Sequence, residues 1–303
     1  MEPLISLCIP TNGITEWVRP VLDSIYSQNV DDSLFEVVVT DNGTNEEFAS
    51  MMHEYCNRYS NLIYSKNEAY LFFNQLEALK AASGRYLKFL NHREMLLDGA
   101  LERLIGIVRD NSSDRPVFYF ANGVIKKGID TQSFDEFVVC LGRYASWTSG
   151  VGIWKEDFLR IKDTLKPDSI SPHSCILYSD RKRSRYVINN DIFTKEIDTD
   201  QSKKGCYDLF KAFAVEEITV TQNLYIDGDI KADTLKKVIR DYRSFVAELY
   251  CDFVMLKRPC SYKLDGFDDA MGIYFSRSSV VARACMVWIG RALDKLKRMI
   301  IKG

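Results

Sequence analysis

Two hydrophobic periodicities alternate along residues 4–121, and this alternation limits the possible folds more than any other feature of the sequence. Short apolar runs predict buried strands, and apolar residues three or four positions apart predict helices. Repeated strand–helix–strand units imply right-handed crossovers and a mostly parallel sheet with helices on both faces, so the predicted fold class is α/β. The predicted strands are 4–9, 35–40, 62–64, 86–90 and 117–121, and the predicted helices are 16–28, 45–59, 71–82 and 97–109.

Polar residues follow three of the predicted strands, in the segments 10–13, 41–44 and 91–94. In parallel α/β sheets, ligands bind beyond the carboxyl ends of the strands. Because those ends meet along one edge of the sheet, we expect the three segments to lie close together. The sequence therefore predicts a ligand site at this edge.

The composition is that of an ordinary globular protein. Of the 303 residues, 46% are hydrophobic and 27% are charged, and the net charge of −2 gives no indication of nucleic-acid binding. The eight cysteines show no zinc-ligand spacing, so we expect reduced, buried thiols in a cytosolic protein. The start Met1-Glu2-Pro3 does not resemble a signal peptide, and no apolar run predicts a membrane span.

The rest of the chain has a different organisation. Residues 126–223 show little periodicity, and their most distinctive stretch is Trp147-Thr148-Ser149-Gly150-Val151-Gly152. After about residue 231 the pattern becomes helical, because apolar residues form one stripe. We therefore predict an α/β domain over residues 1–230 and a helical extension over residues 231–303. The stripe consists of Leu235, Val238, Ile239, Tyr242, Phe245, Val246 and Leu249.

Four segments in order carry a resemblance to a known family. The first strand leads into Pro10-Thr11, and the helix after it ends in Ser24-Ile25-Tyr26-Ser27-Gln28. The second strand leads into Asp41-Asn42-Gly43-Thr44, and the helix that contains Asn74 is followed by Ser83-Gly84-Arg85-Tyr86-Leu87-Lys88-Phe89-Leu90. Over residues 3–125 this order resembles family 2 glycosyltransferases. Within the family it is similar to bacterial enzymes that build O-antigens and capsules, including the abequosyltransferase-like branch, which Ser149-Gly150 and residues 204–209 also resemble.

The resemblance implies a GT-A fold, which is a Rossmann-like, mostly parallel sheet flanked by helices. It also implies an inverting enzyme that moves a sugar from a UDP, dTDP, GDP or CDP donor to a lipid-linked glycan in cell-surface polysaccharide synthesis. Asp41 corresponds to the family residue that accepts the N3–H of uracil or thymine, although an Asp here is also typical of a turn or a helix cap. The implied nucleotide-binding residues are Pro10, Thr11, Asp41, Asn42, Asn74 and Asn91.

The sequence departs from the family at residues 91–94. The family has Asp-x-Asp-Asp here, and its carboxylates hold Mn²⁺ or Mg²⁺ on the diphosphate. Asn91 and Arg93 replace the first two carboxylates, and only Glu94, together with His92, is left as a candidate metal ligand. Arg93 and His92 are alternatively candidates for binding the diphosphate directly, because a guanidinium matches phosphate oxygens.

His173 is the candidate general base, since an imidazole titrates near neutral pH and the resemblance places acceptor-site residues in this part of the chain. A lone histidine is also often structural. Asp157, Asp168 and Asp180 compete with it for this role. Trp147 has two interpretations, a platform for a sugar ring and a core residue.

Residues 276–303 carry seven basic residues and one acidic residue, Asp294. Apolar residues interleave with them, which predicts a basic amphipathic helix on an anionic membrane surface. With the resemblance, this predicts a cytoplasmic protein held peripherally on the inner face of the bacterial membrane. The alternative is a terminal helix docked on its own domain with a solvated charged face.

Two other functions remain open at this stage. The altered residues 91–94 are consistent with an inactive GT-A domain that binds a nucleotide sugar or scaffolds partner transferases. A nucleotidyltransferase with a related sheet is disfavoured, because no glycine-rich phosphate loop follows the first strand.

Overall fold

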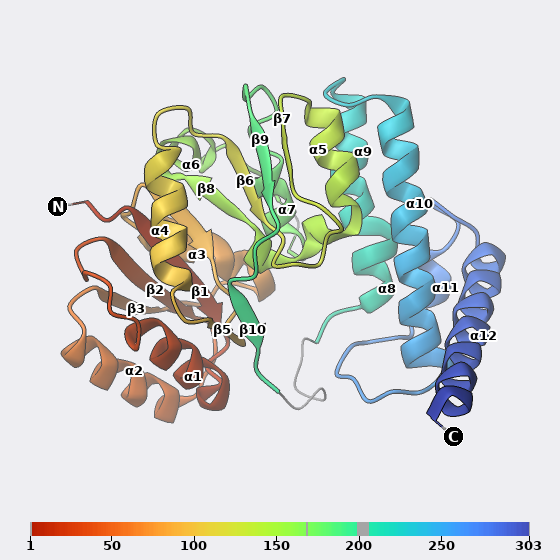
Figure 1. Cartoon of the computed structure of the whole chain (residues 1–303), viewed down its shortest axis with the longest axis horizontal. Coiled ribbons are helices and arrows are strands. Elements are labelled where there is room, and N and C mark those ends of the chain that lie inside the picture. Colours follow the sequence, from red (N-terminus) through yellow and green to blue (C-terminus); the bar gives the residue numbers. More distant parts are fainter. Residues whose placement is uncertain (1, 168, 199–205, 303) are drawn as a thin grey trace. The chain divides into compact units, whose positions relative to one another are not determined.

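The computed structural model describes residues 2–167, 169–198 and 206–302, with side chains except those of residues 296 and 299–302. The chain divides into two compact units, residues 1–199 and 200–303 (Figure 1). This boundary differs from the predicted one at residue 230. The reason is that α9 (Glu217–Ile226) packs along α10 (Ala232–Leu249) and so belongs with the second unit.

A five-stranded sheet in the order β3-β2-β1-β4-β8 forms the centre of the first unit. The neighbouring strands from β3 to β4 are parallel, as predicted, and β8 pairs with β4 in the antiparallel direction. The sheet is therefore mostly parallel with one antiparallel edge. Its strands are β1 (Ile5–Thr11), β2 (Phe35–Asp41), β3 (Leu62–Lys66), β4 (Tyr86–Phe89) and β8 (Gly152–Trp154).

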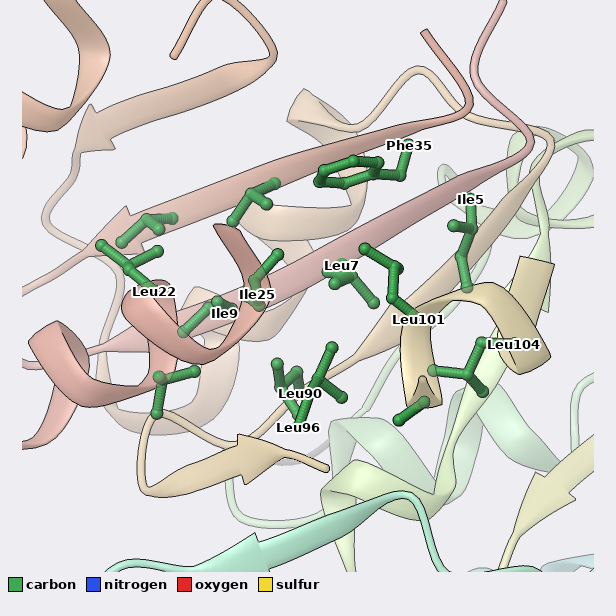
Figure 2. Packing of buried hydrophobic residues seen from close by; sticks show 14 of the residues in the cluster. Ile5, Leu7, Ile9, Leu22, Ile25, Phe35, Leu90, Leu96, Leu101 and Leu104 are labelled. Atoms are coloured by element: carbon green, nitrogen blue, oxygen red, sulfur yellow. The ribbon is translucent and has the colours of Figure 1, made fainter. Parts of the chain in front are cut away.

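Helices cover both faces of this sheet, because its central strands are apolar on both sides. On one face, Leu22 and Ile25 of α1 and Leu101 and Leu104 of α4 pack with side chains of β1 (Figure 2). On the other face, α3 packs against β1 and β2. Each fully buried Leu or Ile stabilises the fold by about 1.5–3 kcal/mol. These helices are α1 (Thr15–Tyr26), α2 (Glu46–Arg58), α3 (Asn74–Ala81) and α4 (Ala100–Asp110).

The four predicted helices are confirmed, with ends shifted by a few residues. Asn45 begins α2, because its side chain accepts hydrogen bonds from the backbone N–H groups of Glu47 and Phe48. The predicted helix 71–82 is divided into the 3₁₀ turn η1 (Leu71–Phe73) and α3. Leu71 adopts a positive φ of 47°, which is incompatible with a continuous α-helix at that point.

The predicted strand 117–121 does not join the central sheet, which corrects the expectation of a fifth parallel strand. It forms β6 (Val117–Phe120), which pairs with β9 (Tyr186–Asn189), and β9 also pairs with β7 (Ile129–Thr131). The place beside β4 belongs to β8, because Gly152 leaves room for the Tyr86 ring. A Cβ at Gly152 would lie 2.6 Å from the Tyr86 ring.

A short antiparallel pair carries the segment after β4. β5 (Glu94–Leu96) pairs with β10 (Thr194–Glu196), so residues 91–94 are fixed between β4 and this pair. The remaining elements of the first unit are α5 (Phe134–Leu141), η2 (Gly142–Ser146), η3 (Thr148–Gly150), α6 (Lys155–Ile161) and α7 (Pro172–Leu177).

The described part of the second unit is helical. The predicted apolar stripe on α10 is confirmed at Leu235, Val238, Tyr242 and Val246, which are buried. Among the described residues, no helix is long and apolar enough to cross a membrane. The other elements are α8 (Leu209–Lys211), the π-helical η5 (Ala212–Glu216) and η6 (Tyr250–Met255), α11 (Phe267–Ala270) and α12 (Arg277–Lys302).

All eight cysteines are free thiols, as expected. Their expected burial holds for Cys8 and Cys251 but is wrong for Cys206 and Cys285, which are exposed. Cys285 lies on the outward side of α12, where the helix has no packing partner in the described structure.

Candidate active site

The carboxyl ends of β1 and β2 are joined by the side chain of Asn74. Its Nδ2 donates to the carbonyl oxygens of Thr11 and Thr40 at 2.9 and 2.8 Å, and its Oδ1 accepts from Asn67 at 2.8 Å. The amide therefore has partners at both ends and is buried. Asn74 shapes the predicted edge of the sheet, and its polar atoms are already engaged within the protein.

Asp41 ends β2 and is fully buried, with 0% of its surface exposed. Its Oδ1 accepts from the Gly43 N–H at 2.7 Å and its Oδ2 from the Tyr64 hydroxyl at 3.2 Å. Burial and the nearby Asp41 charge raise the pKa of Tyr64, so its hydroxyl stays protonated and can donate. Asp41 thus forms a turn with Gly43, and the cap of the next helix is Asn45 instead.

Two glycines allow the loops after β1 and β2 to close over Asp41. Gly13 has a φ of +77°, and a Cβ there would lie 3.1 Å from Oδ1 of Asp41. At Gly43 a Cβ would lie only 2.1 Å from the carbonyl oxygen of Asn12. Larger residues at either place would force the loops apart and change access to the carboxylate.

The two other predicted nucleotide-binding residues of these loops have structural contacts. Asn42 donates through Nδ2 to the carbonyl oxygens of Ala69 and Leu71 at 2.8 and 3.1 Å. Pro10 is half-buried within β1, where it is paired in register with Thr40 of β2. Both residues lie at the predicted edge of the sheet.

His92 is placed against the end of β1. Its Nδ1 lies 2.8 Å from Oγ1 of Thr11, which also accepts from the Gly13 N–H at 3.1 Å. Its ring meets Trp17 edge to face, with ring centroids 5.1 Å apart. Burial, and secondarily the Arg93 charge, lower the pKa of His92 to about 3, so the ring is neutral at physiological pH. In the tautomer that accepts the Thr11 proton at Nδ1, Nε2 carries a hydrogen and is a donor.

Arg93 stacks its guanidinium on the Trp17 ring, 5.3 Å from the ring centroid. Its Nε donates weakly to Oδ1 of Asn91 at 3.4 Å. Its Nη1 is buried without a hydrogen-bond partner, and no ion pair of Arg93 is found in the described part of the chain. A buried N–H donor without a partner is costly, and this donor on a cationic guanidinium matches an oxyanion.

Glu94 is not arranged as a metal ligand. Its Oε1 accepts from Nε1 of Trp147 at 3.0 Å, and its Oε2 accepts from Oγ1 of Thr194 at 3.1 Å. Burial raises the pKa of the carboxyl group. Within residues 2–167, 169–198 and 206–302 no group of three His, Cys, Asp or Glu side chains can hold a metal ion. The residues present therefore do not fit a hard-cation site.

Two residues for which the sequence predicted no role at the site hold this segment in place. Lys88, in the middle of β4, donates to the carbonyl oxygens of Phe89 and Ser149, and burial lowers its pKa to about 8. Ser149 accepts from the N–H of Asn91 through Oγ at 2.8 Å. A lysine inside an otherwise apolar buried strand was the available signal, because such a lysine needs polar partners.

His173 is held by a hydrogen bond to Ser146, which precedes Trp147. It is 4% exposed in α7, and its Nε2 lies 2.9 Å from the carbonyl oxygen of Ser146, next to Trp147. A carbonyl oxygen only accepts, so Nε2 carries the hydrogen in this contact. The ring has to leave Ser146 before Nε2 can take a proton from an acceptor. Trp147 itself is half-buried and donates from Nε1 to Oε1 of Glu94; its contact with a sugar ring stays a prediction.

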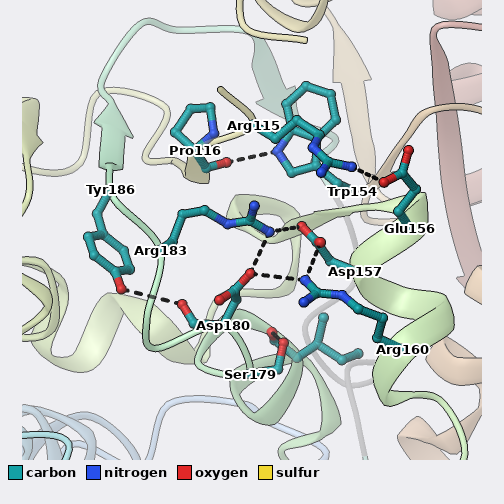
Figure 3. Close-up of polar contacts among 11 residues, drawn as sticks. Arg115, Pro116, Trp154, Glu156, Asp157, Arg160, Ser179, Asp180, Arg183 and Tyr186 are labelled. Carbon is teal, nitrogen blue, oxygen red and sulfur yellow. Dashed lines mark hydrogen bonds and ion pairs between the residues drawn. The ribbon is translucent and has the colours of Figure 1, made fainter. Parts of the chain in front are cut away.

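Asp157 and Asp180 belong to a separate ion-pair network (Figure 3). Both carboxylates pair with Arg160 and Arg183. Asp157 follows β8, which runs antiparallel to β4, so it lies at the amino edge of the parallel strands and not with the other candidates. Asp168 lies outside the described residues, as do Lys204 and Gly205 of the later motif.

The family comparison agrees with this geometry. Residues 6–153, just under half of the chain, match the family described as Glycosyl transferase family 2. Over this segment the chain is similar to family 2 glycosyltransferases. It contains the segments 10–13, 41–44 and 91–94, which the fold brings to one edge of the sheet. No curated protein matches the chain significantly.

Solved structures show the same GT-A fold over most of the chain. S. aureus TarS 1–349 is 16% identical with a TM-score of 0.61, and the match covers 94% of this chain and 82% of that one. TarS 1–349 in complex with UDP is 15% identical with a TM-score of 0.57, covering 90% and 80%. The mannosyltransferase PcManGT from Pyrobaculum calidifontis, in complex with GDP-Man and Mn²⁺, is 14% identical with a TM-score of 0.53, covering 97% and 81%. The abequosyltransferase-like branch finds no support among these structures.

Proposed function

We propose that the protein is an inverting glycosyltransferase in which Arg93 replaces the metal ion on the diphosphate of a nucleotide-sugar donor. The observation that carries the proposal is the buried Nη1 of Arg93, which has no partner in the described structure. A diphosphate oxygen is the acceptor and counter-charge that this guanidinium lacks. The solved neighbours in complex with UDP, UDP-GlcNAc and GDP-Man support a nucleotide sugar as the donor class.

The neighbouring residues suit the same donor. Neutral His92 contributes a hydrogen bond from Nε2 and no charge, so the positive charge comes from Arg93 alone. Asp41 is the acceptor for a base N–H after the loops of Gly13 and Gly43 open, because its buried carboxylate lies directly against these two glycines. In the transition state, charge develops on the departing diphosphate, and a fixed guanidinium stabilises that charge.

His173 is our candidate for the base that deprotonates the acceptor hydroxyl. Its contacts support this role. Its Nε2 donates to the carbonyl oxygen of Ser146, and the next residue, Trp147, donates to Glu94 at the site. The role requires the ring to exchange the Ser146 carbonyl for the acceptor hydroxyl. The acceptor we propose is a lipid-linked glycan of cell-surface polysaccharide synthesis, such as an O-antigen or capsule, and the transferred group is a hexose or deoxyhexose.

The proposal predicts donor turnover without added metal. A panel of UDP-, dTDP-, GDP- and CDP-sugars is incubated with the protein in EDTA, and release of the nucleoside diphosphate is measured with and without added Mn²⁺. We expect release in EDTA from at least one donor, with little change on adding Mn²⁺. Loss of all turnover in EDTA with recovery in Mn²⁺ would show that Glu94 and its neighbours form a metal site.

The inactive-domain alternative has one observation in its favour. In the described structure, none of the candidate site carboxylates, Asp41 and Glu94, is exposed, so no acidic side chain is ready to act as base or ligand. Binding without turnover, seen as a thermal shift by a donor that the protein never cleaves, would establish that alternative. Measurable donor hydrolysis would exclude it.

A further inference from the structure

The last helix, α12, has one packed face. Val280 and Ala284 are fully buried, and the helix packs against α10 and η6. Arg291 forms an ion pair with Asp252 of η6. The first half of α12 is therefore docked on the second unit, which corresponds to one of the two alternatives that the sequence left open.

The opposite face of α12 is apolar and has no partner in the described structure. Met286, Ile289 and Leu293 are spaced three and four residues apart, so they form one stripe, and they are 60%, 50% and 52% exposed. Trp288, one position before Ile289, is also exposed. Four large apolar side chains exposed on one helix indicate a binding surface, because a soluble surface rarely gathers them.

The charges around this stripe are positive and open. Arg277 and Arg291 are neutralised by Asp268 and Asp252. Lys295, Lys297 and Arg298 are exposed, and the described residues include no ion pair for them. The sequence of residues 276–303 contains only one acidic residue, Asp294. The described side chains of residues 292–298 are all exposed, so this end of α12 projects beyond its packed face.

We propose that this face of α12 binds an anionic lipid surface, with the stripe 286–293 in the headgroup region, Lys297 at the phosphates, and Lys295 and Arg298 adding positive charge nearby. An interfacial helix combines an apolar stripe, basic residues and too little hydrophobicity to span, and α12 has all three. Lys297, four residues after Leu293, flanks the stripe, and its long side chain reaches the phosphates while the helix lies flat. Lys295 and Arg298 lie on the other side of the helix and add positive charge close to the surface. The proposal is independent of the transferase activity.

A second copy of the chain is the competing partner. The spacing of Met286, Ile289 and Leu293 is also that of a coiled-coil seam, and the sequence continues it at residues 296 and 300. This seam covers about two heptads, fewer than the three or four that a coiled coil usually requires. Two such helices would also bring like charges together, whereas an anionic surface complements them.

The test is co-sedimentation of the full-length protein with phosphatidylcholine vesicles, with and without phosphatidylglycerol. We expect binding only to the anionic vesicles, and weaker binding at high salt. A basic residue at such a surface strengthens binding about fivefold, so Lys295→Ala/Lys297→Ala/Arg298→Ala should bind at least about fivefold more weakly, mostly through the loss of Lys297. The matched control Lys126→Ala/Lys127→Ala/Lys162→Ala makes the same charge change at exposed lysines elsewhere and should bind like wild type.

A second variant tests the apolar part. Ile289→Asn/Leu293→Asn changes exposed residues, so the fold should survive, as circular dichroism will show, while vesicle binding falls at constant charge. Two results would overturn the proposal. One is a wild-type protein that ignores anionic vesicles at low salt, and the other is equal loss of binding in the basic variant and its control. A dimer in sedimentation velocity that Ile289→Asn/Leu293→Asn dissociates, without vesicle binding, would assign the face to a second copy.

Discussion

At the scale of single residues, Trp17 organises the candidate phosphate site. Its ring supports the Arg93 guanidinium on its face and meets the His92 imidazole at 78°. The Trp17 ring thereby holds the guanidinium in place without a carboxylate. A carboxylate partner would compete with a diphosphate for binding to Arg93. The same contact explains why His92 stays neutral, because the ring is desolvated and lies beside a positive charge.

The neutral state of His92 has a consequence for stability. The folded pKa of about 3 lies below the usual value of 6.5, so the unfolded chain binds the extra proton between these pH values. Stability from His92 is therefore complete above about pH 6.5 and is lost as the pH falls toward 3. We expect His92→Asn to flatten the decline of the melting temperature over this window relative to wild type. Parallel curves for the two proteins would contradict the assignment.

The proposed donor site selects its nucleotide through Asp41. Asp41→Asn keeps the size but loses the charge-assisted acceptor, so binding of the matching nucleotide should fall by at least tenfold. The control is Asp157→Asn, a second buried Asp at the opposite edge of the sheet. Both variants should be destabilised, by about 1–3 kcal/mol in denaturant titrations. Equal nucleotide affinity for Asp41→Asn and wild type would remove Asp41 from the site.

At the scale of elements, the loops after β1 and β2 control access to Asp41. Gly13→Ala adds a Cβ 3.1 Å from the Asp41 carboxylate at a positive φ, whereas Gly99→Ala adds one at a positive φ with nothing within 4 Å. Both changes should cost about 1–2 kcal/mol of stability for the left-handed backbone. Only Gly13→Ala should alter nucleotide affinity in calorimetric titrations. An equal effect of both variants on affinity would mean that the loop does not gate the carboxylate.

The elements that could be predicted from sequence are those with local signals. The alternation of periods was sufficient for β1 to β4 and for the helices between them, and the polar strand ends were sufficient to predict which segments meet at one edge of the sheet. Lys88 and Ser149 were missed because their contacts join residues 61 positions apart. Edge strand β8 was missed because its pairing depends on Gly152 fitting against Tyr86, a contact that no local pattern displays.

The candidate site was predicted in its composition more than in its geometry. Asn74 and Asn42 were predicted to contact the nucleotide, and in the structure their side-chain amides donate to backbone carbonyl oxygens. The sequence does not show whether an Asn at a strand end binds a ligand or the backbone. Asp180 and Asp157 were competitors for the base until the direction of β8 placed the Asp157 network at the other edge. Arg93 was predicted from the sequence as a candidate for binding the diphosphate. The stacking of its guanidinium on Trp17 could not be predicted, because it depends on how α1 packs.

At the scale of the whole molecule, the two units carry different parts of the proposed function. The described donor-site residues all lie in the unit of residues 1–199, and the exposed basic face lies in the unit of residues 200–303. A glycosyltransferase that acts on lipid-linked acceptors needs both a nucleotide-sugar site and contact with a membrane surface. Changes on α12 should therefore leave the turnover of a soluble acceptor unchanged.

The central claim is that Arg93 binds the diphosphate in place of a metal ion. The most direct measurement is calorimetric titration in EDTA of the selected nucleoside diphosphate and of its nucleoside, with wild type, Arg93→Gln and the control Arg115→Gln. A hydrogen-bonded charged contact contributes about 1.5–3 kcal/mol, so Arg93→Gln should lose roughly 10- to 150-fold in diphosphate affinity. Nucleoside affinity should stay constant, and Arg115→Gln should bind both ligands like wild type. Undiminished diphosphate affinity in Arg93→Gln, or diphosphate binding that requires Mn²⁺ in wild type, would contradict the claim.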